Sequence, residues 1–296
     1  MKRYTFIIPQ DIGEERLLNF AQRRLPQLPP HALREAFDRR DVKQNGSRMD
    51  RRALALPGAT VEIYVAERVK PREIAVLYQD ENVLVIVKPA GVSCEADAHG
   101  GLPLPALLQQ QLGYEPLLCH RLDNPTEGLM VLARNAQALA ELERAFRERE
   151  IIKGYTCLVR GTPRPKHAVL KAYLLKDAKA ARVSVTASPR AGSVPIVTEY
   201  TVVSPGACSR LEIRLHTGRT HQIRAHMAFA GHPLLGDDQY GDRAFNRQYH
   251  ARRLMLCATT LCLRLQGLLA YLDNKTFSHI PAFMQEIESC IPKKSG

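Results

Sequence analysis

The sequence lacks the features that mark membrane, secreted or zinc-binding proteins. No run approaches roughly 18 consecutive apolar residues, so we predict no membrane-spanning helix. The basic N-terminus is followed by only a short apolar stretch before Pro9, too short for a signal peptide. The cysteines form no C-x-x-C pair, so neither a zinc site nor a disulfide framework is predicted. We therefore expect a cytoplasmic protein with reduced thiols. The seven cysteines are at positions 94, 119, 157, 208, 257, 262 and 290.

Several sequence motifs of enzymes are also missing. The chain has no G-x-x-x-x-G-K-[ST], no G-x-G-x-x-G after a predicted strand and no G-x-S-x-G, so nucleotide-cofactor and serine-hydrolase chemistry has no support. His221 and His226 are five positions apart, which misses the helical spacing of zinc ligands. Together with Asp237 and Asp238 they leave a metal-dependent nuclease as an alternative, but no acidic cluster has ligand spacing. We expect no metal and no cofactor.

What the sequence has in excess is positive charge. Its 296 residues include 42 Lys and Arg against 30 Asp and Glu, a net charge of +12 and a pI near 9.5. Such a surplus favours a polyanionic partner, most often nucleic acid, although it could also serve solubility or an anionic membrane surface. The length allows one large domain or two.

The N-terminal segment predicts a small basic α+β module. We expect a strand over 1–10, helices over 14–25 and 31–40, an Asn-Gly hairpin beginning at 41, and a strand over 60–65. The hairpin and its flanks carry a cluster of cations with three acidic residues among them. The cluster consists of Arg39, Arg40, Lys43, Arg48, Arg51 and Arg52. Residues 12–66 resemble the small RNA-binding domain shared by a ribosomal small-subunit protein and many RNA-modifying enzymes, so we expect these side chains to contact RNA phosphates.

The remaining chain alternates between predicted strands and helices. Between 160 and 190 it has eight Lys or Arg and a single acid, Asp177, and it is interrupted by Pro163 and Pro165, which favours a basic, loop-rich arm over a polyanion. In the segment after it, Thr220 is expected to cap a helix in which Ile223, Met227 and Ala230 face the core. Strands are expected over 74–78, 83–87, 129–132, 152–159, 194–203, 209–215 and 252–265, and helices over 104–112 and 135–150.

The candidate for chemistry is Asp123, in the stretch His120-Arg-Leu-Asp-Asn-Pro-Thr-Glu-Gly128. Asn124-Pro125 predicts a turn and the apolar run after it predicts a buried strand, which would hold a reachable carboxylate rigidly. Taken alone, the stretch is better explained by a turn in which Asp123 caps backbone N–H groups.

Three blocks of sequence bear on that choice. HRLDNPTEGLMVLA (120–133), KGYTCLVRG (153–161) and TGRTHQIRAHMAFAGHPLLGDDQYG (217–241) resemble, in order and spacing, the blocks of the RluA-type pseudouridine synthase family. With KPAGV (88–92) the resemblance covers about residues 72–290. It implies an α+β fold in which a catalytic domain with a mixed, mostly antiparallel sheet (71–296) follows the small α+β RNA-binding domain (1–70).

The resemblance also implies roles for individual residues. Asp123 would be the catalytic aspartate, Tyr155 would stack on the target uracil and assist proton movement, and Arg224 would pair with Asp123. Arg121 would lie against the RNA where the target nucleotide is extruded. Leu122 and Ile223 would be apolar walls of the substrate pocket.

The chain departs from the family pattern at two positions. Glu127 stands where the family usually has Ser, and the family often has His near the position of Cys257. A carboxylate at 127 that faced the site would repel RNA and raise the pKa of Asp123. We therefore predict that Glu127 points away from the site, toward a basic neighbour.

The sequence thus predicts a cytoplasmic, monomeric RNA pseudouridine synthase that needs no cofactor. Large-subunit (23S) ribosomal RNA is the expected substrate, with transfer RNA as the alternative. A competing hypothesis from another class is a ribosome-associated RNA-binding protein that has lost catalysis. The presence of Asp123, Tyr155 and Arg224 argues against that hypothesis.

Overall fold

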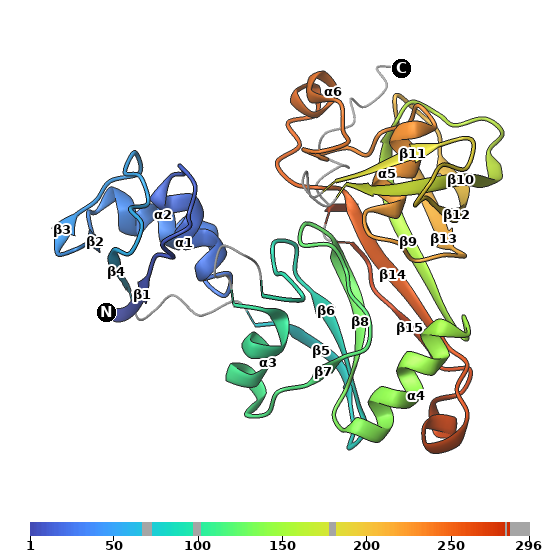
Figure 1. The fold of residues 1–296 in the computed structure, drawn as a ribbon, viewed down its shortest axis with the longest axis horizontal. Helices are drawn as coiled ribbons and strands as arrows, with labels where there is room; N and C mark the ends of the chain where they lie inside the picture. The colour runs from blue at the N-terminus through green and yellow to red at the C-terminus, as the bar shows by residue number, and fades with distance from the viewer. Residues whose placement is uncertain (67–72, 97–101, 178–181, 282, 285–296) are drawn as a thin grey trace, which may run out of the picture. The chain divides into compact units, whose positions relative to one another are not determined.

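The computed structural model describes residues 1–66, 73–96, 102–177, 182–281 and 283–284 (Figure 1). The chain forms two compact units. One contains residues 1–75 and 91–116, and the other contains residues 76–90 and 117–296. The linker predicted around 69–72, the tail after 285 and Cys290 lie outside the described residues. The domain boundary at residue 70 stays a prediction.

The first unit contains a four-stranded sheet of order β1-β4-β2-β3. Its apolar core is formed by alternate residues of β1 and β4 and one face of each helix, including Phe6, Phe20 and Phe37, all buried. The predicted elements are confirmed, and the strand expected over 60–65 matches to the residue. Their bounds are β1 (Lys2–Ile7), α1 (Leu17–Arg24), α2 (Pro30–Asp38), β2 (Val42–Gln44), β3 (Ser47–Arg48) and β4 (Thr60–Val65).

The predicted Asn-Gly hairpin joins β2 and β3. Asn45 and Gly46 both have positive φ, at 50° and 80°, the conformation that a two-residue hairpin turn requires. The same unit contains α3 (Leu104–Leu112), at the position where the sequence predicted a helix. Gln111 on α3 exchanges two hydrogen bonds of 2.9 Å with the backbone N–H and carbonyl of Ile74.

The second unit is built on one large sheet of order β11-β10-β12-β13-β9-β14-β8-β6-β5, with β15 beside β14 and β7 beside β8. Of its described pairings only β14 with β8 is parallel, so the predicted mixed, mostly antiparallel α+β fold is confirmed. The strands are β5 (Ala75–Gln79), β6 (Val83–Lys88), β7 (Leu117–Leu118), β8 (Glu127–Ala133), β9 (Ile151–Arg160), β10 (His167–Asp177), β11 (Arg182–Thr186), β12 (Val194–Ser204), β13 (Cys208–Leu215), β14 (Leu256–Leu263) and β15 (Thr276–Ser278).

Strand β8 is the most deeply buried element of the sheet. All seven of its residues are buried, because β14 and β6 flank it and α4 (Ala136–Arg147) covers one of its faces. As predicted, Asn135 caps α4 by accepting a hydrogen bond from the N–H of Ala138 at 2.9 Å. A strand held in this way is a rigid support for the loop that precedes it.

The expectation of a loop-rich arm over 160–190 is wrong. Most of this region is the hairpin of β10 and β11, and β10 also pairs with β12. Ala172 and Leu174 are buried. They pack with Val183 of β11, with Ile196 of β12 and with Ala225 of the helix over 222–229. Apolar residues alternate with period two along β10, which indicates a strand, although the charges and prolines of the region favour a loop.

Helix α5 (Gln222–Phe229) also differs from its prediction in detail. Its N-cap residue is His221 in the left-handed conformation (φ 54°) rather than Thr220, and no side chain caps it. Ile223 and Met227 are buried as expected, but Ala230 is exposed. The helix is buried over most of its circumference, so a single apolar stripe could not describe it.

Two shorter helices complete the second unit. These are α6 (Arg243–Gln248) and the 3-10 helix η1 (Gly267–Leu272). No helix within the described residues is long and apolar enough to cross a membrane.

Candidate active site

The loop that carries Asp123 runs into β8 and is fixed by a buried lysine. Lys88, at the end of β6, is fully buried and donates hydrogen bonds to the carbonyls of Pro89 (3.1 Å) and Asn124 (3.2 Å). The N–H of Thr126 closes the turn on the carbonyl of Asp123 at 3.0 Å. Lys88 belongs to the KPAGV segment, but no pattern in the sequence predicted that it holds the neighbouring loop.

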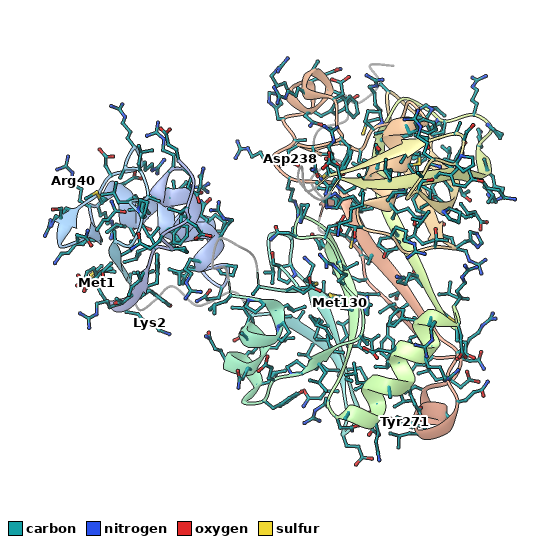
Figure 2. All side chains as sticks on the ribbon, viewed as in Figure 1. Met1, Lys2, Arg40, Met130, Asp238 and Tyr271 are labelled. Atoms are coloured by element: carbon teal, nitrogen blue, oxygen red, sulfur yellow. The ribbon has the colours of Figure 1, made fainter. Side chains whose placement is uncertain are left out.

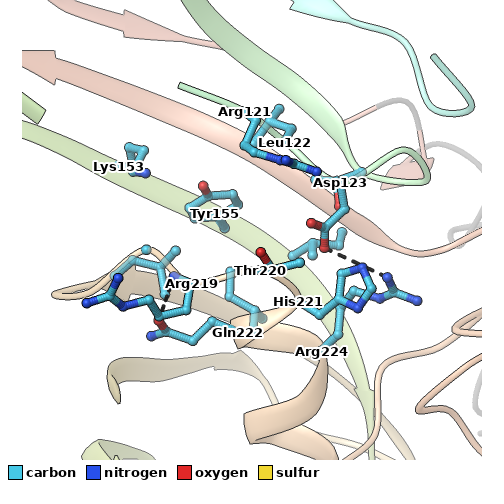
Figure 3. A pocket seen from close by; sticks show the side chains of 15 residues that line it. Arg121, Leu122, Asp123, Lys153, Tyr155, Arg219, Thr220, His221, Gln222 and Arg224 are labelled. Carbon is cyan, nitrogen blue, oxygen red and sulfur yellow. Dashed lines mark hydrogen bonds and ion pairs between the residues drawn. The ribbon is translucent and has the colours of Figure 1, made fainter. Parts of the chain in front are cut away.

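The carboxylate of Asp123 is not used as a cap. Among the described residues it accepts no hydrogen bond from a backbone N–H, so the capped-turn interpretation has no support. Its ion-pair partner is Arg224, whose Nη1 lies 3.8 Å from Oδ2 of Asp123 (Figure 3). The Asp123 side chain is 17% exposed and therefore reachable from solvent.

Arg224 is held mainly by a different carboxylate. Its Nε and Nη2 donate to the two oxygens of Asp237 at 2.7 and 2.9 Å, which is a bidentate ion pair between two buried side chains. The backbone N–H groups of Gln239 and Tyr240 also donate to Asp237. The third carboxylate, Asp238, lies 3.5 Å from Arg224 but is 93% exposed. Asp237 and Asp238 were considered at the sequence level only as metal ligands, and the role of Asp237 was missed.

Burial and ion pairing shift the pKa values of Arg224 and Asp237 in opposite directions. Burial alone would lower the pKa of Arg224, but its hydrogen bonds and attraction to Asp237 outweigh this, and the pKa is raised. Burial likewise favours a higher pKa for Asp237, and the hydrogen bonds from Arg224 hold it below its usual value instead. Both groups therefore stay charged, and a fixed positive charge faces Asp123.

Tyr155 comes from β9 and is 5% exposed. Its backbone pairs with Ala258 of β14, which in turn pairs with Gly128 of β8. Burial, with smaller contributions from the charges of Asp123 and Cys257, raises the pKa of Tyr155. The phenol is therefore protonated near neutral pH and can donate a hydrogen bond.

A cavity of about 100 Å³ unites these side chains (Figure 3). It brings together all six residues that the sequence assigned to catalysis and substrate binding: Arg121, Leu122, Asp123, Tyr155, Ile223 and Arg224. They come from three distant segments of the chain. The remaining lining residues include Lys153, Arg219, His221 and Leu256, which the sequence analysis did not assign to the site.

The contact between His221 and Tyr240, like the pair of Arg224 and Asp237, was not predicted from the sequence. Nδ1 of His221 lies 2.9 Å from the hydroxyl of Tyr240, which accepts a hydrogen bond from the N–H of Val183 on β11. The guanidinium of Arg224 lies 5.2 Å from the centre of the Tyr240 ring. Burial lowers the pKa of His221. Tyr240 therefore ties the first turn of α5 to the β10–β11 hairpin.

Glu127 points away from the cavity, as predicted. Its Oε2 accepts a hydrogen bond from Arg253 at 2.8 Å, and His279 lies 3.4 Å from Oε1. Cys257 adjoins this pair, and ligand atoms of Glu127, Cys257 and His279 lie within 4.8 Å of one another. The three could in principle hold a metal ion, but the guanidinium of Arg253 already balances the only carboxylate of the group.

The six cations predicted to bind RNA lie in the first unit, and several have partners there. Arg39 pairs with Glu35 and Arg51 with Asp38, while Lys43 lies 5.6 Å from the ring centre of Tyr64. Arg40, Arg48 and Arg52 are exposed, and Arg40 is labelled at the surface of this unit in Figure 2. Within the described part of the chain these three have no carboxylate partner.

Comparison with protein families identifies the central part of the chain. Residues 82–229 match the family described as RNA pseudouridylate synthase. This range contains Asp123, Tyr155 and Arg224.

Curated relatives cover most of the chain. It is 32% identical over 266 residues to ribosomal large subunit pseudouridine synthase C of Escherichia coli K12, covering 81% of each chain. It is 28% identical over 277 residues to the protein of the same name in Vibrio cholerae, covering 86% of each.

Two solved human structures have a similar fold. RNA pseudouridylate synthase domain containing 4 is 26% identical, with a TM-score of 0.57, over 71% of this chain and 90% of that one. RNA pseudouridylate synthase domain containing 1 is 24% identical, with a TM-score of 0.56, over 75% of this chain and 96% of that one.

Proposed function

We propose that this chain, which belongs to the RNA pseudouridylate synthase family and is an RNA pseudouridine synthase, isomerises specific uridines of large-subunit (23S) ribosomal RNA. In this proposal Asp123 is the catalytic carboxylate. The observation that carries the proposal is the cavity in which Asp123 meets Tyr155 and Arg224. The names of the relatives support ribosomal RNA as the substrate.

The size of this cavity favours base flipping. A space of about 100 Å³ admits a planar base and excludes a duplex. A target uridine must therefore leave its stack to reach Asp123, at a cost of a few kcal/mol. Arg121 is exposed and lines the cavity, so it is placed to lie against the strand from which the nucleotide is extruded.

The isomerisation breaks the bond between nitrogen 1 and ribose carbon 1′ and forms a bond from carbon 5 to the same carbon. Carbon 5 loses a proton and nitrogen 1 gains one, so atoms and electrons balance without a co-reactant. In our proposal the Asp123 carboxylate reacts with the ribose, and Arg224 keeps it ionised and aimed. Tyr155 stacks on the uracil, and its protonated hydroxyl donates to the base while it turns. Leu122 and Ile223 give the base an apolar wall.

The small N-terminal unit would supply RNA affinity in this scheme. Its exposed arginines would contact phosphates, which set position without reading sequence. We place the protein in the cytoplasm as a monomer acting on ribosomal RNA, with transfer RNA as the alternative substrate.

The decisive experiment measures tritium release from RNA labelled at carbon 5 of uridine. We expect release with the wild-type protein and at least a thousandfold slower release with Asp123→Asn, while RNA binding is retained because Asp123 supplies no positive charge. Pseudouridine mapping in a strain that lacks the protein would identify the target position. Absence of release from any ribosomal or transfer RNA would contradict the proposal and favour a binding protein without catalysis.

A further inference from the structure

A second, larger cavity adjoins the Asp123 cavity in the same unit. Its volume is about 520 Å³, and it lies between the end of α4, the start of β9 and the loop that follows β13. The two cavities have five lining residues in common. These are Arg121, Lys153, Leu215, Gly218 and Arg219. Figure 3 shows Lys153 and Arg219 away from Asp123 and Arg224, and both of these basic residues also line the second cavity.

The lining of this second cavity is strongly cationic. None of its fourteen lining residues is acidic. Six are Lys or Arg: Arg121, Arg147, Arg149, Lys153, Arg214 and Arg219. Among the described residues, Arg147, Arg149, Arg214 and Arg219 have no carboxylate partner.

The acidic residues near this cavity are already engaged. Glu148 and Glu150 both pair with Arg144. Glu199 pairs with His216, at 2.7 Å. The positive charge of the cavity is therefore not neutralised by its surroundings. Concentrated charge of one sign in a concave surface raises the local concentration of the opposite charge.

Lys153 stands where the two cavities meet. Its ammonium lies 5.3 Å from the ring centre of Phe146, and a Cβ built on Gly218 would be only 3.3 Å from it. Burial lowers the pKa of Lys153, and Cys119 acts in the opposite direction without reversing the shift. No carboxylate among the described residues pairs with it. A phosphate at this point would supply the counter-charge that the protein does not.

We propose that this cavity, from Arg147 and Arg149 through Lys153 to Arg219, holds the sugar–phosphate backbone of the single RNA strand on one side of the target uridine. The proposal rests on the proposed function and specifies how the substrate enters the site. Its volume falls in the range of ligand-binding pockets, roughly 300–1,000 Å³, and suits a short single-stranded segment. The contacts would fix the strand and leave the choice of sequence to other parts of the protein.

The test uses Arg147→Gln/Arg149→Gln in the full-length protein. Binding of a uridine-containing single-stranded oligoribonucleotide is measured as a function of KCl concentration. The binding constant K falls as salt rises, and each lost phosphate contact makes the slope of log K against log salt less steep by about 0.7. It also weakens binding about fivefold at 0.1 M salt. In tritium release, we expect the RNA concentration for half-maximal rate to rise and the single-turnover rate at saturating RNA to stay unchanged.

The matched control is Arg243→Gln/Arg247→Gln on α6, which removes the same charge at exposed positions at the other end of this unit (Figure 1). A salt slope for Arg147→Gln/Arg149→Gln equal to that of this control, with Arg214→Gln also unchanged, would overturn the proposal. Binding and catalysis are read separately here. If the wild type is inactive but Arg147→Gln/Arg149→Gln still lowers the salt dependence of binding, the proposed function alone is refuted. If the wild type is active and the double variant leaves the salt dependence unchanged, only the proposal that this cavity holds the RNA backbone is refuted.

Discussion

Arg224 faces three carboxylates, and burial decides which of them matters for stability. Asp237 is buried and bidentate, Asp238 is almost fully exposed, and Asp123 is distant at 3.8 Å. The strong pair with Asp237 fixes the guanidinium, and the weaker approach leaves Asp123 available to substrate. Asp237 is thus the structural partner of Arg224, which agrees with the proposal that Asp123 is the carboxylate that reacts.

We predict that Asp237→Asn lowers both stability and turnover. Breaking a buried ion pair by removing one partner costs about 3–5 kcal/mol, because the remaining charge is uncompensated. We also expect the single-turnover rate to fall at least tenfold, because Arg224 is no longer held in place. Urea unfolding and tritium release measure the two effects. Asp238→Asn is the control and should change stability by less than about 0.5 kcal/mol, since exposed pairs contribute little; equal effects of the two substitutions would contradict this assignment.

The contrast between Asp237 and Asp123 shows what the sequence could predict at this scale. The three family blocks placed Asp123, Tyr155 and Arg224 in one site, and the structure brings them together. They did not predict that Asp237 is the main partner of Arg224. The choice among neighbouring carboxylates depends on how the turn after α5 folds back on the helix. The direction of Glu127 was predictable because a carboxylate in the cavity would have opposed anion binding.

At the scale of elements, the close approach of β8 and β14 positions the site. Gly128 has φ +127°, and a Cβ there would lie 2.3 Å from the carbonyl oxygen of Ala258. Because Ala258 also pairs with Tyr155, any displacement of β14 changes the spacing between Tyr155 and the loop of Asp123.

We therefore predict that Gly128→Ala destabilises the protein by about 3 kcal/mol or more, combining backbone strain with overpacking. Tritium release per folded molecule should also fall. Gly231→Ala is the matched control, because Gly231 has a positive φ of 85° but nothing within 4 Å of its Cβ position. The Gly231→Ala variant should lose only about 1–2 kcal/mol of unfolding free energy and keep the wild-type single-turnover rate. A wild-type rate for Gly128→Ala would show that the strand spacing does not set the site.

Helix α5 carries a buried histidine that makes the protein sensitive to acid. Burial lowers the pKa of His226 to about 4, and its Nδ1 lies 3.0 Å from the hydroxyl of Thr198. As pH falls below about 6.5, the unfolded chain binds a proton that folded His226 does not bind until about pH 4. The stability that depends on neutral His226 is complete above pH 6.5 and is lost as pH falls toward 4.

We predict that this residue alone lowers the free energy of unfolding by about 2 kcal/mol between pH 7 and pH 5. Urea unfolding of wild type and His226→Asn at both pH values isolates the effect, since His120 and His221 are common to both proteins. The variant should lose about 2 kcal/mol less than wild type over this interval. Parallel losses in the two proteins would contradict the role of His226.

Local sequence signals predicted the elements well where one signal dominated. The strand Thr60–Val65 matched its predicted bounds and the helix Leu104–Leu112 lies where it was expected, since a strict alternation marks the first and a proline start marks the second. The β10–β11 hairpin was missed because the Lys and Arg residues and the prolines of this region favoured a loop, although its apolar residues alternate; it is stabilised by pairing with β12 and packing on α5. Tertiary contacts of this kind leave no local trace.

At the scale of the whole molecule, the net charge of +12 is distributed unevenly between neutralised and available cations. In the small unit, Arg39 and Arg51 are paired, whereas exposed Arg48 and Arg52 have no carboxylate partner among the described residues. Only cations without an internal partner can bind phosphate without first giving up an ion pair.

We predict that Arg48→Gln/Arg52→Gln reduces the salt slope of RNA binding by about 0.7–0.9 per contact, and that Arg39→Gln/Arg51→Gln reduces it less. The single-turnover rate should stay unchanged in both, because these residues lie outside the unit that contains Asp123. Filter binding at several KCl concentrations compares the two pairs at equal net charge. The reverse order of effects would show that internal pairing does not control phosphate binding here.

Strand β14 has a consequence for the moment at which activity arises during translation. Residues 256–263 lie between β8 and β9, so the loop of Asp123 and the ring of Tyr155 are spaced correctly only after this late segment has joined the sheet. A nascent chain that ends before residue 256 can form the small unit and many hairpins of the second, yet its site is incomplete. The protein is therefore expected to bind RNA before it can modify it.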